Sequence, residues 1–151
     1  MKHSAKRPIM VVDIDGTLSE VGPRRRLLEE SPVDWEAFYE DEFDDPPKRN
    51  VCSFVSYAAR RLEVIFCTSR RESVRLKTQR WIARHLGLVS GGYRLIMREN
   101  GDVRPAVVQK WDQFRKETTE EERGRVLFIL DDDKTVAHMW RRRGFVCFEV
   151  K

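Results

Sequence analysis

The sequence predicts an α/β domain in which helices cover both faces of a mostly parallel β-sheet. Short apolar runs recur along the 151 residues and alternate with segments whose apolar residues have helical spacing. Three of these runs, Ile9–Asp13, Val64–Thr68 and Val126–Asp131, are continuously apolar up to a final polar residue. Such runs are typical of parallel strands that are covered on both faces. Strand–helix alternation then indicates three layers with the sheet in the middle.

Five strands and four helices are expected. The strands are Ile9–Asp13, Val64–Thr68, Leu95–Met97, Val126–Asp131 and Phe145–Val150. A first helix is predicted over residues 51–62, because its apolar residues recur on one helical face. Three more helix patterns cover residues 74–86, 107–114 and 136–140. Gly87 and Gly144 follow two of these patterns, in the position where glycine commonly ends a helix.

Length and composition limit the class of protein. A chain of 151 residues fits one domain, which we predict over residues 1–151. The longest apolar runs have four or five residues, against the roughly 20 that a membrane-spanning helix needs. We therefore expect no membrane span, and the N-terminus lacks an apolar stretch for a secretion signal. Three widely spaced cysteines without a CxxC pair favour the reducing cytoplasm.

The charged residues are unevenly distributed, although the net charge is only +4. Residues 27–48 hold nine acidic residues and one basic residue, whereas residues 60–84 hold eight basic and two acidic ones. The basic segment would attract a polyanion if it formed one surface, or it is simply a solvated helix face. The acidic segment, residues 27–48, is predicted to be a short insertion with one or two short helices. Its aromatic residues would either form a wall of the site or, as the simpler alternative, pack against the hydrophobic core. They are Trp35, Phe38, Tyr39 and Phe43.

Two carboxylates lie at the end of the first predicted strand. Asp13 and Asp15 are two residues apart and precede Gly16 and Thr17. Ligands of open α/β sheets bind outside the carboxyl ends of the strands, so both carboxylates emerge where a site is expected. Asp-Gly is also a common turn dipeptide, which gives Asp15 a purely structural alternative. Asp13 ends an apolar strand, where an ionised group is costly unless it is paired or bound to a metal.

A second acidic group, Asp131, Asp132 and Asp133, ends the strand Val126–Asp131. Three adjacent carboxylates repel one another, and a magnesium ion shared with Asp13 would compensate them, because hard cations prefer oxygen ligands. Asp133 is equally suited to cap the helix that follows. We therefore predict Asp131 and Asp132, but not Asp133, as part of a Mg²⁺ site.

Two further segments carry groups that suit phosphate. The strand Val64–Thr68 ends in Thr68, followed by Ser69 and Arg70, and Lys110 stands at the start of a later predicted helix. A hydroxyl, a guanidinium and an ammonium group together can bind phosphoryl oxygens and neutralise developing charge.

Taken in order, Asp13-x-Asp15-Gly-Thr, Thr68, Lys110 and Asp131-Asp132 resemble the four motifs of the haloacid dehalogenase superfamily of phosphotransferases. The resemblance covers nearly the whole chain. It implies a three-layer Rossmann-like core with strand order 3-2-1-4-5. Because only 52 residues separate Asp15 from Thr68, we expect no cap domain or a minimal one, and hence an open site.

The sequence is most similar to the 3′-phosphatase domain of phage polynucleotide kinase–phosphatases. The likeness lies in Thr68-Ser-Arg70-Arg-Glu72, Gly101-Asp102-x-Arg104 and Met139-Trp-Arg-Arg142-x-Gly144. Arg24 stands where that family has a phosphate-contacting arginine. Ala106 departs from the pattern, because the family has an acidic residue there. The chain has no glycine-rich phosphate loop of the GxxxxGKS/T type, so no kinase module is expected.

The resemblance implies a role for each motif residue. Asp13 would be the nucleophile that forms an aspartyl-phosphate, and Asp15 the general acid and base. Asp13, the Asp15 carbonyl and Asp132, helped by Asp131, would hold Mg²⁺. Thr68 and Lys110 would hold the transferring group. The residues expected beside the phosphate or its nucleoside are Gly16, Arg24, Ser69 and Arg70.

These features together predict a Mg²⁺-dependent phosphomonoesterase that removes 3′-phosphate from nucleic acid ends or nucleotides. The basic residues 60–84 favour a nucleic acid, since phosphate contacts supply salt-dependent affinity. A phosphatase of free nucleoside monophosphates is the main alternative and needs no basic surface. A non-catalytic module that binds nucleic acid ends is the other, although it would have no need of the full set of catalytic residues.

Overall fold

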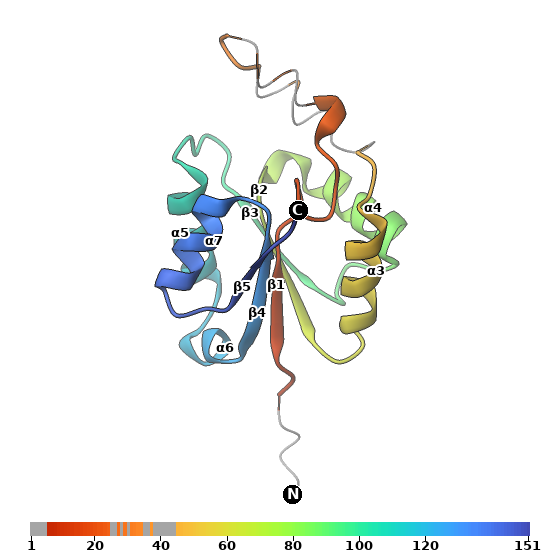
Figure 1. The fold of residues 1–151 in the computed structure, drawn as a ribbon, viewed down its shortest axis with the longest axis vertical. Coiled ribbons are helices and arrows are strands. Elements are labelled where there is room, and N and C mark those ends of the chain that lie inside the picture. Colours follow the sequence, from red (N-terminus) through yellow and green to blue (C-terminus); the bar gives the residue numbers. More distant parts are fainter. Residues whose placement is uncertain (1–5, 25–26, 28, 30, 35–36, 38–44) are drawn as a thin grey trace, which may run out of the picture.

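The computed structural model describes residues 6–24, 27, 29, 31–34, 37 and 45–151. Its centre is a five-stranded sheet in which all paired strands are parallel, in the order β3-β2-β1-β4-β5 (Figure 1). The strands are β1 Ile9–Val12, β2 Glu63–Arg71, β3 Arg94–Arg98, β4 Val126–Asp131 and β5 Cys147–Glu149. The predicted fold class and strand order are both confirmed.

Helices cover the two faces of the sheet. On one side lie α3 Arg49–Ala58 and α4 Arg75–Leu86; on the other lie α5 Ala106–Glu117, α6 Glu120–Gly124 and α7 Lys134–Arg142 (Figure 1). Two short 3₁₀ helices, η1 Gly22–Arg24 and η3 Glu72–Val74, lie near the carboxyl ends of the strands. The helix α6 was not predicted. Its start is a capping box in which Thr119 and Glu122 each accept a hydrogen bond from the other's backbone N–H.

The strand β1 divides the core into two layers. Met10 and Val12 face the α3–α4 side, whereas Ile9 and Val11 face the α5–α7 side, and all four are at most 1% exposed. Burial on both faces explains why this segment is apolar at every position. The chain must then turn at the carboxyl end of β1, where Asp13 begins the site.

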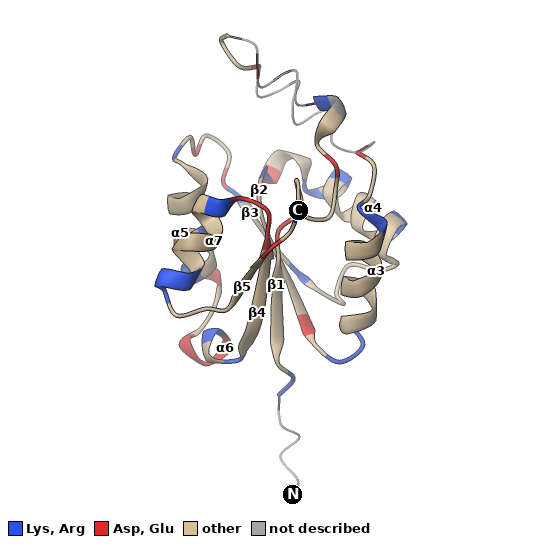
Figure 2. Cartoon of the chain, viewed as in Figure 1, with Lys and Arg blue, Asp and Glu red and all other residues tan. Residues whose placement is uncertain are grey.

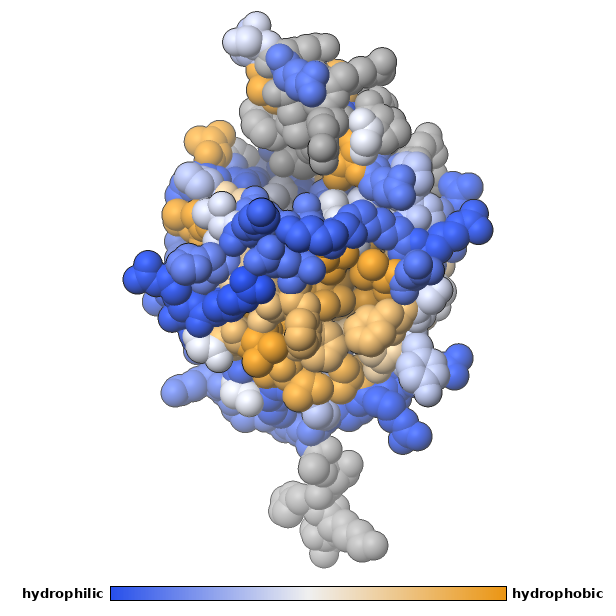
Figure 3. Space-filling view, in the orientation of Figure 1, coloured by the Kyte–Doolittle hydropathy of each residue, from blue (hydrophilic) through white to orange (hydrophobic). Residues whose placement is uncertain are grey.

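Coverage of the sheet is incomplete at β4 and β5. Figure 3 shows an apolar area on this part of the molecule, where Phe54 of α3 and Phe148 of β5 are 50% and 56% exposed and flank Phe128. Leu127 is 54% exposed at an irregularity in the β1–β4 pairing, so the expectation that the whole β4 run is covered on both faces was wrong. The edge of β5 is protected by Arg141, which donates to the Cys147 carbonyl.

The basic residues 60–84 are spread over several parts of the fold. Arg60 and Arg61 precede β2, at the end of the sheet opposite to Asp13. Arg70 is 0% exposed, and Arg75 pairs with Glu72. The exposed basic residues of α4, Lys77, Arg80 and Arg84, fit the alternative of a solvated helix face, and attraction of a polyanion by this segment stays a prediction.

Three other expectations concern the aromatic residues of the acidic segment, the cysteines and membrane-spanning helices. Trp35, Phe38, Tyr39 and Phe43 lie outside the described residues. Cys52, Cys67 and Cys147 are all buried free thiols. Within the described part of the chain, no helix has the length and apolar character needed to cross a bilayer.

Candidate active site

Acidic residues gather at the carboxyl ends of β1 and β4 (Figure 2). Asp13 directly follows β1, and Asp131 ends the neighbouring β4. Lys110 lies in the second turn of α5 and donates to both carboxylates, at 2.9 Å to Asp13 Oδ1 and 2.8 Å to Asp131 Oδ2. All three side chains are at most 5% exposed. The structure thus brings together three residues that the sequence motifs singled out.

The second oxygen of Asp13 is also oriented. Thr17 Oγ1 lies 2.9 Å from Asp13 Oδ2 and 3.1 Å from Asp132 Oδ1. Its single hydroxyl proton can go to only one of them at a time. Thr17 belongs to the motif after β1, but sequence reasoning gave it no role. With Lys110 on one oxygen and Thr17 near the other, the Asp13 carboxylate has a defined orientation.

Three carboxylates, from Asp13, Asp131 and Asp132, each offer an oxygen within 4.8 Å of the others. Burial raises the pKa of Asp13 to about 6 against the opposing effect of Lys110, and burial together with Asp13 raises the pKa of Asp132 to about 6. Burial lowers the pKa of Lys110, but Asp13 and Asp131 outweigh it and hold the pKa above its usual value. One ammonium therefore faces three carboxylates, and the uncompensated charge of two fits a divalent cation with oxygen ligands.

Gly16 is required by the geometry beside this cluster. Its φ is +84°, and a Cβ atom there would lie 2.1 Å from Asp132 Oδ2 and 2.5 Å from Asp132 Cγ. Any side chain would displace the Asp132 carboxylate. Gly16 thus allows Asp132 to approach the loop after β1, which accounts for its place in the motif.

Asp15 is held by two arginines rather than by Lys110. Arg70 donates to both of its oxygens, at 3.0 and 2.8 Å, and Arg24 Nη2 donates to Oδ1 at 2.9 Å. Burial acts to raise the pKa of Asp15, but Arg70 and Arg24 outweigh it and lower the pKa. Both guanidinium groups are almost completely buried. In this state they bind Asp15, and their predicted contact with a phosphate or nucleoside stays a prediction.

Asp45 completes this ion-pair network, and sequence reasoning missed it. Arg24 pairs with both of its carboxylate oxygens, with Nε 2.8 Å from Oδ1, and Arg70 Nη2 lies 3.8 Å from Oδ2. Trp81 Nε1 donates to the Asp45 carbonyl at 2.9 Å. Two arginines therefore face two carboxylates. The only signal in the sequence was an aspartate just before Pro46-Pro47, and this position does not indicate which residue it would pair with.

Thr68 directly follows the regularly paired part of β2, because pairing with β3 is regular from Ile65 to Cys67 and becomes irregular between Cys67 and Arg71. The strand β2 continues to Arg71, so Thr68 lies within it, and its hydroxyl accepts from the Arg70 N–H at 3.2 Å. Ser69, rather than Thr68, lines the cavity beside Asp13. A phosphate contact by the Thr68 hydroxyl stays a prediction.

A pocket of about 160 Å³ opens over these groups, and we call it the central pocket. It is lined by Asp13, Asp15, Ser69, Ala106, Lys110, Asp131, Asp132, Asp133 and Val136. Asp133 also caps α7 by accepting from the backbone N–H groups of Thr135 and Val136, so the capping alternative applies to it.

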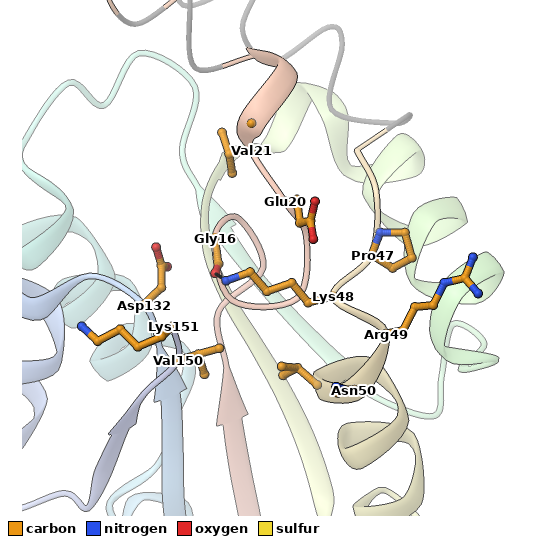
Figure 4. Close-up of a pocket in the computed structure, with 12 residues that line it drawn as sticks. Gly16, Glu20, Val21, Pro47, Lys48, Arg49, Asn50, Asp132, Val150 and Lys151 are labelled. Carbon is orange, nitrogen blue, oxygen red and sulfur yellow. Dashed lines mark hydrogen bonds between the residues drawn. The ribbon is translucent and has the colours of Figure 1, made fainter.

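A wider groove of about 990 Å³ adjoins the Asp132 side, between the loop after β1 and the start of α3; we call it the front groove (Figure 4). Lys48 reaches across it and donates to the Gly16 carbonyl at 2.5 Å. Arg49 and Lys151 also line it, as does the acidic Glu20. The site is thus open on this side, as expected for a chain with no large cap among the described residues.

Comparison with known proteins places the chain among phosphatases. A family model described as the polynucleotide kinase PNKP phosphatase domain matches residues 7–151. No curated protein gave a significant match.

Solved structures agree with this match. A chain in the Pnkp1/Rnl/Hen1 RNA repair complex has a TM-score of 0.77 at 27% identity, covering 99% of this chain and 44% of its own length. A chain in a second Pnkp1/Rnl/Hen1 complex has a TM-score of 0.74 at 28% identity, covering 97% and 47%. The present chain thus spans less than half of these relatives. A haloacid dehalogenase-like hydrolase from Streptococcus pneumoniae has a TM-score of 0.61 at 10% identity over 96% and 85% of the two chains, which shows the fold alone.

Proposed function

The chain belongs to the family of polynucleotide kinase PNKP phosphatase domains, and on that premise we propose that it is a Mg²⁺-dependent phosphomonoesterase that removes the 3′-phosphate from nucleic acid ends. It is a haloacid dehalogenase-type phosphatase domain, as its sequence motifs predicted. The observation that carries the proposal is the oriented Asp13 carboxylate, with Lys110 on one oxygen and Thr17 by the other.

Asp13 is the proposed nucleophile. Its carboxylate attacks phosphorus, the bond from phosphorus to the leaving oxygen breaks, and an aspartyl-phosphate forms. Lys110 keeps Asp13 oriented and helps to neutralise the charge of the transferring group. Hydrolysis of the aspartyl-phosphate by water then frees Asp13 and releases phosphate.

Asp15 is the proposed general acid and base. It gives a proton to the leaving oxygen in the first step and takes one from the attacking water in the second. Arg70 and Arg24 lower its pKa, which favours the ionised form. A phosphate dianion near these arginines weakens their effect on Asp15 and raises its pKa, so substrate binding itself favours the proton-carrying form.

Asp13, the Asp15 backbone carbonyl and Asp132, with Asp131 behind them, are the groups that would hold Mg²⁺. When bound, the ion supplies positive charge that offsets the repulsion between the carboxylate nucleophile and the phosphate. The excess of two negative charges in the three-carboxylate cluster supports this assignment.

Phosphate release from matched substrates tests the proposal. The panel is a 3′-phosphorylated oligonucleotide, its 5′-phosphorylated counterpart, and free 3′- and 5′-nucleoside monophosphates, each with Mg²⁺ and with chelator. We expect preference for the 3′-phosphorylated oligonucleotide. Asp13→Asn removes turnover, whereas Glu99→Gln, at an exposed ion pair with Lys116, retains it.

The other outcomes of this assay have definite meanings. Preference for free nucleotides would replace the proposal by a nucleotidase function. Binding of nucleic acid ends without any turnover would make the chain an end-binding module. Turnover by Asp13→Asn would overturn the assignment of the nucleophile.

A further inference from the structure

A second cavity, of about 360 Å³, lies beside the central pocket and shares no lining residue with the front groove. Its volume lies within the range of about 300–1,000 Å³ that is typical of small-molecule sites. We call it the arginine pocket; it is lined by Ser69, Arg71, Arg98, Asp102, Val103, Arg104, Pro105 and Ala106. Ser69 and Ala106 also line the central pocket. A group bound here is therefore next to a phosphate held at Asp13.

The wall of the arginine pocket is preformed. Arg98 is 8% exposed and donates to three backbone carbonyls, of Ser69 at 3.2 Å, Asp102 at 3.1 Å and Arg104 at 2.7 Å. One buried guanidinium thus ties the loop before α5 to the end of β2. Since the loop is already ordered, binding in the pocket requires little further ordering of the chain.

Arg104 is the main exposed cation of this wall, and its guanidinium plane is fixed. Asp102 accepts from Nε at 3.0 Å and from Nη2 at 2.8 Å, and Asp112 accepts from Nη1 at 2.7 Å. The side chain nevertheless remains 49% exposed. Guanidinium N–H groups donate in the plane of the group, so these hydrogen bonds do not use the faces of the plane, on which another planar group can stack. Nucleobases stack on arginine planes of this kind.

The composition of the lining also suits a nucleotide. Arg71, Arg98 and Arg104 face one acidic residue, Asp102, while Val103, Pro105 and Ala106 supply an apolar wall. The front groove is less suitable, because Glu20 and Asp132 line it together with its three basic residues, and Lys48 is already bound to the Gly16 carbonyl.

We propose that the arginine pocket binds the terminal nucleoside of a 3′-phosphorylated polynucleotide, with the base stacked on Arg104 and the adjoining phosphodiester attracted by Arg71. This inference rests on the phosphatase function proposed for Asp13 and names the part of the chain that distinguishes a polynucleotide from a small phosphate ester. Cations near the backbone of the substrate raise its affinity in a salt-dependent way.

Charge changes at Val103 test the inference without disturbing the fold, because this side chain is 86% exposed at the rim of the pocket. We expect Val103→Glu to lower kcat/KM for a 3′-phosphorylated oligonucleotide by about five- to tenfold relative to that for p-nitrophenyl phosphate, and Val103→Lys to raise this ratio. Both effects diminish as salt rises.

Val89 provides the matched control. It is 68% exposed in the loop that leads to the amino end of β3, far along the sheet from the carboxyl ends. Val89→Glu and Val89→Lys introduce the same charges and leave the substrate ratio unchanged. Equal responses at Val103 and Val89 would overturn the inference, since they would reflect net charge alone.

Arg104→Lys tests the stacking role, because lysine keeps the charge but lacks the planar fork. We expect it to raise KM for the oligonucleotide nearly as much as Arg104→Ala does, with a smaller change in kcat. Restoration of KM to the wild-type value by lysine would overturn the stacking role.

Binding measurements separate this inference from the proposed function. Fluorescence anisotropy with a labelled 3′-phosphorylated oligonucleotide and the Asp13→Asn protein measures the affinity for the oligonucleotide in the absence of turnover. If the wild-type protein hydrolyses none of the substrates, the proposed function fails. Weaker oligonucleotide binding by Asp13→Asn/Val103→Glu than by Asp13→Asn would then still support the pocket. If hydrolysis occurs but neither binding nor the substrate ratio responds to Val103, the pocket assignment fails.

Discussion

The side-chain nitrogen of Lys110 lies 2.9 Å from Oδ1 of Asp13, in an ion pair whose two side chains are each only 5% exposed. The residues are 97 positions apart in the sequence and meet because α5 begins near the carboxyl end of β1. Buried ion pairs add little net stability, since desolvation offsets most of the attraction. The function of this ion pair is instead to fix the position of the Asp13 carboxylate.

Removing the Lys110 charge should therefore affect both stability and activity. Lys110→Met leaves Asp13 and Asp131 buried without their cation, which destabilises the fold by about 3–5 kcal/mol. Urea unfolding in chelator measures this loss. Turnover should fall by about a hundredfold or more. The double variant Lys110→Met/Asp131→Asn should recover part of the stability but not the activity; recovery of both would contradict the role of Lys110.

Gly16→Ala should weaken metal binding more than it weakens the fold. The added Cβ would stand 2.1 Å from Asp132 Oδ2, so the Asp132 carboxylate must move away from Asp13. We expect a rise in the Mg²⁺ concentration for half-maximal activity by about tenfold or more. Gly87→Ala is the control, because Gly87 also has a positive φ but nothing within 4 Å of its Cβ position. An unchanged Mg²⁺ requirement in Gly16→Ala would contradict the assignment of Asp132.

Much of the fold could be predicted from the sequence, because burial on both faces leaves a direct signal. The segment Ile9–Val12 is apolar at every position and forms the central strand. The short helix α6 was missed even though its capping residues Thr119 and Glu122 are readable in the sequence. The exposed Leu127 could not be predicted, since exposure there depends on which helices cover β4.

The candidate site was predictable only in part. Residues that follow the strands were predictable from the topology, whereas those whose partners depend on the path of a connecting segment were not. Asp13 and Asp131 follow neighbouring parallel strands, so topology alone brings them together. Asp45 lies in a connecting segment without periodicity, and its pairing with Arg24 depends on how that segment closes over the sheet. The pairing of Arg70 with Asp15 likewise depends on β2 continuing to Arg71, beyond the end of its apolar run.

Stability in the absence of metal should depend on pH through Asp132. Its pKa is raised to about 6 in the folded protein from 3.8, so the folded state binds more protons between these values and loses stability as pH rises through them. Asp132→Asn does not ionise and escapes this loss. In chelator near pH 7.5 we expect the variant to be more stable by about 1–2 kcal/mol, since solvent screens a partly exposed carboxylate.

Thermal unfolding of both proteins across pH measures this difference. It should shrink by more than half near pH 4.5, where the wild-type carboxyl is mostly protonated in the folded state. Saturating Mg²⁺ at high pH should stabilise the wild type more than the variant. A difference that is independent of pH would show that the substitution acts through packing rather than through charge.

Asp45→Asn should destabilise the fold and reduce kcat, although Asp45 lines none of the three cavities described here. It leaves Arg24 and Arg70, both almost fully buried, facing Asp15 alone. Loss of one partner from a buried ion-pair network lowers the free energy of unfolding by about 3–5 kcal/mol. Both arginines then bind Asp15 more strongly, which disfavours its proton-carrying form and slows the step that protonates the leaving oxygen.

The choice of substrate separates this effect from mere loss of folded protein. p-Nitrophenyl phosphate has a good leaving group that needs little protonation, so Asp45→Asn should slow its hydrolysis less than that of a nucleoside 3′-phosphate. Glu99→Gln, which removes an exposed carboxylate paired with Lys116, should change stability by less than about 1 kcal/mol and leave both rates unchanged. Equal slowing of the two substrates by Asp45→Asn would mean that Asp45 supports the fold but does not act through Asp15.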